Sequence, residues 1–351
     1  MPPAGTADAV PVPVALTREP YHGDAWARLY NPADDHGAPD APHVRVDGIR
    51  GRGAGRDGTG PQELSLADAI PNSPEVLVLE PGGRLAGLRL RDVWAYRELL
   101  YFLVWRDVKV RYKQTVFGAA WAILQPLAAA VVFTIFFGRL AGMPSDGLPY
   151  PLFAYAGLLV WTFFAQGLSQ ASASVVGSAN LITKVYFPRI VIPLSSVLSG
   201  LLDMAVATPI LVVMMAYYRV RPGGSVVAAP LALVLALLTV IGVGLWLSAL
   251  NVEYRDVRFV VPFMVQLWLF ATPVIYPASI VAPHLERVGV PGWALGLNPM
   301  AGVVEGFRWA VLSRGEAPVA LMTASAVVAA VLCVTGALYF RSVEREFADV
   351  V

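Results

Sequence analysis

Charged residues are scarce in this sequence of 351 residues. Asp, Glu, Lys and Arg make up 15% of it and 56% of the residues are hydrophobic, whereas soluble domains are about 25% charged. So few charges cannot cover the surface of a water-soluble globule, which argues strongly against a soluble enzyme. The net charge of +1 argues against a nucleic-acid-binding protein, because such a protein needs a basic surface.

The residues of metal, disulfide and nucleotide sites are also lacking. Cys333 is the sole cysteine, and the four histidines show no metal-ligand spacing, so we expect neither a disulfide framework nor a metal site. No GxxxxGK[ST] loop occurs, and the chain is therefore not expected to hydrolyse ATP by the P-loop route.

The charges that are present divide unevenly along the chain. Residues 1–83 carry twelve acidic residues against six arginines and are rich in proline and glycine, whereas the remainder carries thirteen acidic against twenty basic residues. An acidic segment rich in proline and glycine cannot bury enough apolar surface to become ordered. We predict a disordered cytoplasmic tail over 1–83, an amphipathic interface segment over 84–115, a transmembrane domain over 116–344 and a cytoplasmic C-terminal tail over 345–351.

Long charge-free stretches organise the transmembrane domain. A helix needs about 20 residues to cross a bilayer, and charge in mid-membrane is expensive. Six stretches meet this criterion, one of them interrupted by Asp203 alone. They predict an all-α integral membrane protein with six transmembrane helices, at about 116–138, 150–170, 194–218, 227–250, 259–277 and 318–340.

The distribution of Lys and Arg predicts the orientation of these spans. With six spans both termini share one side, and the loops of that side carry fourteen Lys and Arg against six in the alternate loops. The positive-inside rule therefore predicts that both termini are cytoplasmic.

Two further segments are apolar but unsuited to spanning. Residues 90–113 mix aromatic with basic side chains, which favours a helix in the cytoplasmic membrane interface, with an ordinary basic flank as the alternative. Residues 279–316 have apolar runs cut by proline and glycine. They predict a re-entrant pair of short helices on the outer side, between the fifth and sixth spans.

Mid-span residues are the first candidates for a substrate path. Asp203 is an ionisable residue within a span, where it serves either as a helix–helix hydrogen-bonding group or in translocation. Aromatic faces can stack on sugar rings, and several aromatic side chains lie away from the headgroup belts where Trp and Tyr usually concentrate. The predicted path residues are Trp161, Phe163, Phe164, Trp268, Phe270 and Asp203; plain helix packing is the alternative for the aromatic ones.

Four separated motifs resemble the permease subunits of type-2 ABC exporters. They are LLYFLVWRDVKVRYKQTVFGAAWAILQPL at 99–127, SANLITKVYFPR at 178–189, GLWLSALNVEYRDVRFVVPFMVQLWLFATPVIYP at 244–277 and LNPMAGVVEGFRWAVL at 297–312. Among these exporters the polysaccharide, O-antigen and teichoic-acid group is the most similar. The resemblance covers about 76–347 and leaves out the acidic tail.

This resemblance implies a permease that pairs as a homodimer and binds two copies of a separate P-loop ATPase. ATP and Mg²⁺ would be held by that partner, and no cofactor by this chain. The cargo would be a lipid-linked polysaccharide or teichoic-acid-like polymer, moved across the bacterial cell (inner) membrane. A drug or lipid exporter of the same architecture, an ion-coupled secondary carrier and an intramembrane glycan-modifying enzyme are the alternatives.

The resemblance also implies roles for particular residues. Coupling to the ATPase would involve Lys184, Tyr186, Phe187 and Arg189, and an outer gate would involve Asn298, Glu305, Arg308 and Trp309. Glu305 and Arg308 are three residues apart and would pair on a helix, with a local surface salt bridge as the alternative. Arg106, Lys109 and Arg111 could attract the diphosphate of a lipid carrier, or anionic membrane lipids in general.

Overall fold

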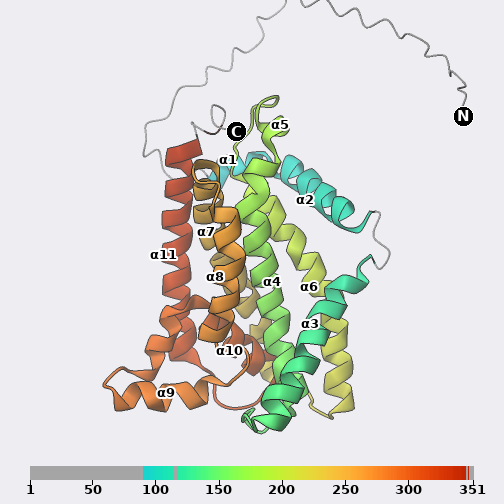
Figure 1. The fold of residues 1–351 in the computed structure, drawn as a ribbon, viewed down its shortest axis with the longest axis vertical. Helices are drawn as coiled ribbons and strands as arrows, with labels where there is room; N and C mark the ends of the chain where they lie inside the picture. The colour runs from blue at the N-terminus through green and yellow to red at the C-terminus, as the bar shows by residue number, and fades with distance from the viewer. Residues whose placement is uncertain (1–89, 114–117, 345–346, 348–351) are drawn as a thin grey trace, which may run out of the picture. The chain divides into compact units, whose positions relative to one another are not determined.

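A computed structural model of the protein describes residues 90–113, 118–344 and Phe347. In these ranges every regular element is a helix (Figure 1), which confirms the predicted all-α class. The predicted acidic tail, 1–83, lies outside the described residues, as do the start of the predicted interface segment and nearly all of the C-terminal tail.

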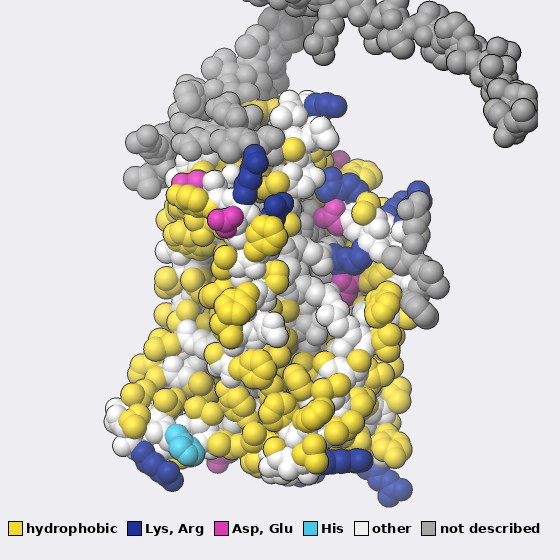
Figure 2. Space-filling model, in the orientation of Figure 1, with side chains coloured by type: hydrophobic (Ala, Val, Ile, Leu, Met, Phe, Trp, Pro, Cys, Tyr) yellow, Lys and Arg dark blue, Asp and Glu magenta, His cyan; other side chains and the backbone are white. Residues whose placement is uncertain are grey.

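Five helices in the described ranges are long and apolar enough to cross a membrane. They are α3 (Ala120–Phe133) with its π-helical continuation η1 (Thr134–Leu140), α4 (Tyr150–Gly177), α6 (Val191–Tyr217), α7 (Ala229–Glu253) preceded by η2 (Gly224–Ala228), and α11 (Val319–Val343). The bundle carries charged side chains mainly at its two ends, with a broad hydrophobic band between them (Figure 2). This arrangement is typical of a membrane-spanning domain.

The predicted fifth span is shorter than the sequence suggested. The corresponding helix, α8 (Val257–Ala271), has 15 residues, which is a length of about 22 Å against a hydrocarbon core of about 30 Å. It ends at Ala271 because Pro273 disfavours helical backbone at the preceding residue, and Thr272 is extended, with φ −104° and ψ 141°. The charge-free run therefore overestimated the length of this helix.

Short helices occupy the connection from α8 to α11. They are α9 (Ala278–Arg287), η3 (Gly292–Leu297) and α10 (Pro299–Leu312). Asn298 begins α10, because its side chain accepts the Met300 N–H at 3.1 Å and Pro299 follows it at the first helical position. In Figure 1 α9 lies across the end of the bundle opposite to α1, α2 and α5.

The N-terminal helices α1 (Leu90–Ala95) and α2 (Arg97–Tyr112) lie at the other end of the bundle (Figure 1). On α2, Leu103 is buried, whereas Tyr101, Phe102 and Trp105 are exposed. Lys109 lies over the Trp105 ring at 5.3 Å. An aromatic and basic outer face is what a helix in the membrane interface requires.

Helix α4 is the central element of the bundle. In its most apolar window 78% of the residues are buried, against 11% for α3. Elsewhere small residues set the packing: a Cβ at Gly242 of α7 would lie 2.6 Å from the Cys333 nitrogen of α11. Glycine therefore lets the α7 and α11 backbones approach closely, as is common between membrane helices.

Candidate functional site

Arg111 fastens α2 to the transmembrane helices. Its guanidinium forms an ion pair with Asp203 of α6 and also donates to Gln170 of α4. Ser199 of α6 accepts a third hydrogen bond at 2.9 Å. The second carboxylate oxygen of Asp203 accepts from the Tyr112 hydroxyl. Asp203 is therefore engaged between helices, with a side chain that is 10% exposed.

Tyr112 stays a hydrogen-bond donor in this cluster. Burial raises the pKa of its hydroxyl to about 12, and the bond to Asp203 acts in the same direction. One helical turn before Arg111 on α2, the Asp107 carboxylate accepts a hydrogen bond from the Ser195 hydroxyl of α6 at 3.2 Å. Polar contacts at 107 and 111 thus set the register of α2 on α6.

The predicted aromatic path residues of α4 lie in the core. Trp161, Phe163 and Phe164 are all buried, and Phe164 contacts the Trp268 ring edge-on at 5.0 Å. Trp268 of α8 donates its Nε1–H to Asn298 at 2.9 Å. These rings consequently join α4 and α8 to the start of α10. Phe270, in contrast, is 54% exposed.

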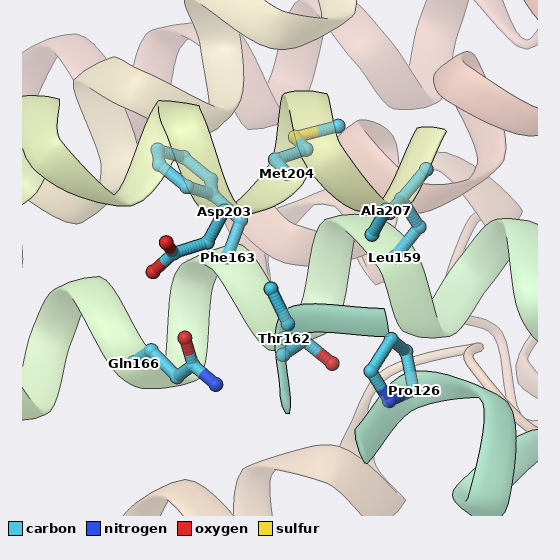
Figure 3. Close-up of a pocket in the computed structure, with 9 residues that line it drawn as sticks. Pro126, Leu159, Thr162, Phe163, Gln166, Asp203, Met204 and Ala207 are labelled. Atoms are coloured by element: carbon cyan, nitrogen blue, oxygen red, sulfur yellow. The ribbon is translucent and has the colours of Figure 1, made fainter. Parts of the chain in front are cut away.

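A small cleft brings Phe163 and Asp203 together (Figure 3). It measures about 10 Å³ and lies between α3, α4 and α6, lined by Ala122, Pro126, Leu159, Thr162, Phe163, Gln166, Asp203, Met204 and Ala207. Gln166 donates to Gln125 of α3 at 2.8 Å beside it. The cleft therefore combines the amide of Gln166, a hydroxyl and a carboxylate with apolar walls.

Arg308 of α10 is buried and holds the non-helical connection after α8. It donates to the carbonyl oxygens of Pro273, at 2.6 Å, and of Val274, and its Nε–H to that of Phe153 at 3.2 Å. The guanidinium also lies 3.6 Å from the centre of the Phe153 ring. These partners offset the cost of burying the charge.

The remaining predicted gate residues surround the same connection. The Glu305 carboxylate lies 3.4 Å from Arg308 and accepts the Ala278 N–H at 2.8 Å. Asn298 donates to Thr272 at 2.9 Å and to the Ala271 carbonyl at 3.1 Å. Glu305 and Arg308 thus form a buried pair rather than a surface salt bridge, while Trp309 is half-buried on the same helix.

The predicted coupling segment follows the short helix α5 (Ala179–Ile182), which projects at the α1 and α2 end of the bundle (Figure 1). Tyr186 is 76% exposed, and Lys184 is exposed as well. Phe187 is 5% exposed and packs in the core at this end. Arg189 donates its backbone N–H to the Glu344 carboxylate at 2.8 Å. An exposed tip is thus held on buried neighbours and on the end of α11.

The predicted headgroup residues differ in their surroundings. The Arg106 side chain is 43% exposed and pairs with the neighbouring Asp107 at 2.8 Å. Lys109 is exposed beside Trp105. Arg111 is drawn into the Asp203 cluster. The structure thus separates two outward-facing basic residues from one that points into the bundle.

Sequence reasoning missed the polar residues that accompany Asp203. Thr162, Gln166 and Gln170 lie four residues apart, so they share one face of α4; this spacing was visible in the sequence. Gly157 had no comparable signal. A Cβ added there would overlap the Arg308 guanidinium, a contact that exists only in the folded chain.

The described residues thus form a helical membrane domain with an N-terminal helix at one end and short helices between the last two apolar segments. The chain belongs to the ABC-2 type transporter family, whose model matches residues 98–312. It is thus a multi-pass membrane protein of a transporter family.

Its similar proteins include permeases of glycan export. An O-antigen export system permease protein, RfbA, of Myxococcus xanthus is 30% identical over 262 residues, which are 74% of this chain and 98% of that protein. A protein of the same name from Klebsiella pneumoniae is 26% identical over 72% of this chain and 95% of its own length. The polysialic acid transport protein KpsM of Escherichia coli is 24% identical over 59% of this chain and 78% of that protein.

Proposed function

We propose that this chain is the permease subunit of an ATP-driven exporter that moves a lipid-linked polysaccharide or teichoic-acid-like polymer outward across the bacterial cell membrane. The similarity to O-antigen export permeases, which spans 95–98% of their length, carries the proposal. The four sequence motifs, at 99–127, 178–189, 244–277 and 297–312, all lie within the family match at 98–312. A drug or lipid exporter would share the fold but not this set of relatives.

Energy would come from a separate P-loop ATPase, of which two copies would bind a homodimer of this chain. The chain itself would hold no cofactor, and ATP and Mg²⁺ would be bound by the partner. The exposed tip at Lys184 and Tyr186 suits this role, since its neighbours Ile182 and Phe187 are buried. A push on the tip would be passed to the core through Phe187, and to α11 through the contact between Arg189 and Glu344.

The lipid carrier would approach the exposed face of α2, the face that does not pack on the bundle. Arg106 and Lys109 are exposed cations beside aromatic side chains, a composition suited to phosphate at the membrane interface. Arg111 is engaged with Asp203, and its proposed role is to hold α2 in register. Both termini would be cytoplasmic in this orientation.

The outer end would be controlled by α9 and α10. Asn298, Glu305 and Arg308 all contact the connection 271–278, so movement of α10 would pull on that connection and on Trp268. Trp309 lies on the same helix. We assign these four residues to the outer gate on that basis.

Two measurements test the proposed function. Co-expression with a P-loop ATPase encoded beside the permease should give a complex that co-purifies in equal amounts; an ion-driven carrier would be recovered without it. Depletion of the permease should remove a surface glycan while its lipid-linked precursor accumulates inside the cell. An unchanged glycan with altered drug resistance or lipid content would contradict the assigned cargo.

A further inference from the structure

Polar groups gather where α3, α4 and α6 meet within the spanning part of the chain. Thr162, Gln166 and Asp203 line the cleft there (Figure 3). Gln166 is hydrogen-bonded to Gln125 at 2.8 Å. In a helix packed against lipid, each such group would have to give up its hydration. Their convergence on one cleft requires a physical reason.

Pro126 adds a backbone acceptor to the same place. In an α-helix the residue four positions later donates its N–H to a carbonyl, but proline has no N–H. The carbonyl affected by Pro126 is that of Ala122, and both residues line the cleft. An unsatisfied carbonyl is costly in hydrocarbon, and Pro is tolerated in membrane helices where other groups or water supply the hydrogen bond.

The polar side chains of α4 continue from the cleft toward α2. Thr162, Gln166 and Gln170 lie on one face of the helix and are half-buried, and Gln170 accepts from Arg111. The exposed side chains of α8 are different, since Phe259, Phe263 and Leu267 at the same spacing are apolar. Ionisable residues at membrane depth, such as Asp203, face the bundle interior or a water-filled cavity and mark substrate pathways.

The α3 wall of the cleft is weakly attached. Its buried residues are Pro126 and Ala130, and 11% of its most apolar window is buried. Segments with few buried contacts are those that move at low cost. The cleft of about 10 Å³ has room for one water molecule, so a larger ligand requires α3 to move away from α4 and α6.

We propose that the cleft between α3, α4 and α6 is a hydrated contact site for the sugar hydroxyl groups of the exported polymer. This inference rests on the proposed function and names the part of the chain that the cargo touches. Amide, hydroxyl and carboxylate groups supply the donors and acceptors that adjacent sugar hydroxyls need, and Phe163 supplies an apolar ring beside them. Arg111 balances the charge of Asp203, so the site suits a neutral polyhydroxyl unit.

Thiol accessibility tests the hydration of the cleft. In a Cys333→Ala background, Gln166→Cys and Thr162→Cys would each be treated in membranes with a charged, membrane-impermeant methanethiosulfonate. The matched control is Leu202→Cys, because Leu202 is next to Asp203 on α6, is 40% exposed and points about 100° away from it. Labelling of the two cleft cysteines but not of Leu202→Cys is the expected result. No labelling of the cleft cysteines would overturn the proposal.

Protection by the cargo tests the contact itself. The permease would be held in complex with a hydrolysis-deficient ATPase partner, in cells that make the lipid-linked glycan and in cells blocked at its first sugar-transfer step. Labelling of Gln166→Cys should be several-fold slower when the glycan is present, because a sugar unit held in the cleft shields the thiol from the reagent. Equal labelling rates in the two cell types would show a hydrated cleft off the export route and would overturn the sugar contact.

Apolar replacements test the same site in transport. Gln166→Leu and Thr162→Val should insert normally and reduce the export rate by about fivefold each, whereas Leu202→Ile should leave it unchanged. Normal export by Gln166→Leu would contradict the site. These outcomes are separate from the proposed function: an unchanged surface glycan after loss of the permease would refute the cargo, whereas labelling would still report whether the cleft is hydrated.

Discussion

Two arginine side chains lie within the described part of the bundle, and different partners balance their charges. Arg111 meets a carboxylate, that of Asp203, and is 23% exposed. Arg308 is 3% exposed and relies on backbone carbonyls at Phe153, Pro273 and Val274 as well as on Glu305. Since breaking a buried pair leaves an uncompensated charge, each arginine should be sensitive to loss of its partner.

The pair Arg111 and Asp203 should show strong energetic coupling. Asp203→Leu and Arg111→Met are each expected to lower the stability by roughly 2–3 kcal/mol, somewhat below the 3–5 kcal/mol of a fully buried pair because Arg111 is partly exposed. The double variant should be more stable than the sum of the two losses predicts. Thermal unfolding of the detergent-purified wild-type protein, the two single variants and the double variant would measure this coupling.

A surface pair serves as the control for this cycle. Arg106→Met removes an arginine whose side chain is 43% exposed and should cost at most about 1 kcal/mol. Strictly additive effects of the Arg111 and Asp203 changes would show that the ion pair does not hold α2 to α6.

The pocket around Arg308 should not tolerate a methyl group at Gly157. A Cβ there would overlap the guanidinium. Gly157→Ala is therefore expected to lower the stability by about 1–3 kcal/mol and to displace Arg308 from its carbonyl partners. Gly177→Ala, also on α4, is the matched control because nothing lies within 4 Å of its added Cβ. Equal unfolding temperatures for the two variants would contradict the packing described for Arg308.

At the scale of elements, the coupling segment divides into an exposed tip and a buried anchor. Tyr186 and Phe187 are neighbours in sequence, but they are 76% and 5% exposed. Phe187 packs in the same cluster as Phe340 and Phe347 at the end of α11. The two positions should therefore respond differently to the same change.

Tyr186→Ala is expected to keep the stability within about 0.5 kcal/mol, as for other exposed positions, and to reduce recovery of the ATPase partner. Phe187→Ala should cost about 3–5 kcal/mol because it leaves a cavity. Unfolding temperature and co-purified ATPase would be measured for both variants. The assignment is wrong if Tyr186→Ala unfolds the protein and leaves ATPase binding intact.

At the scale of the whole molecule, the two ends of the described bundle differ. One end carries α1, α2 and α5, and the other carries α9 (Figure 1). The basic loops of the sequence belong to the first end, so the positive-inside rule predicts that this end is cytoplasmic.

Single cysteines would establish this orientation. In a Cys333→Ala background, Tyr186→Cys should react with an impermeant thiol reagent only after the membrane is opened, whereas Val288→Cys, 73% exposed beyond α9, should react in intact spheroplasts. Both positions are exposed, which controls for local burial. The reverse pattern of reactivity would contradict the predicted orientation.

Much of the fold could be predicted because the residues of a segment decide by themselves whether it forms a membrane helix. The charge-free runs locate α3, α4, α6, α7, α8 and α11, because length and hydropathy decide whether a helix can span. The mixed aromatic and basic run at 90–113 locates α2. The length of α8 was overestimated, since one proline ended the helix inside an unbroken apolar run. The four-residue spacing of Thr162, Gln166 and Gln170 was equally visible, but it gains meaning only beside Gln125 and Asp203.

The sequence by itself determined that this chain is an α-helical membrane protein of the ABC-2 type, because composition and ordered motifs are properties of the chain. Tertiary structure alone decided which polar residues from distant parts of the chain meet. It joined Arg111 to Asp203 across 92 positions and Arg308 to Phe153 across 155. Hydrogen bonds and ion pairs act over a few ångströms, so such partners are set by how the helices pack and leave no periodic signal in the sequence.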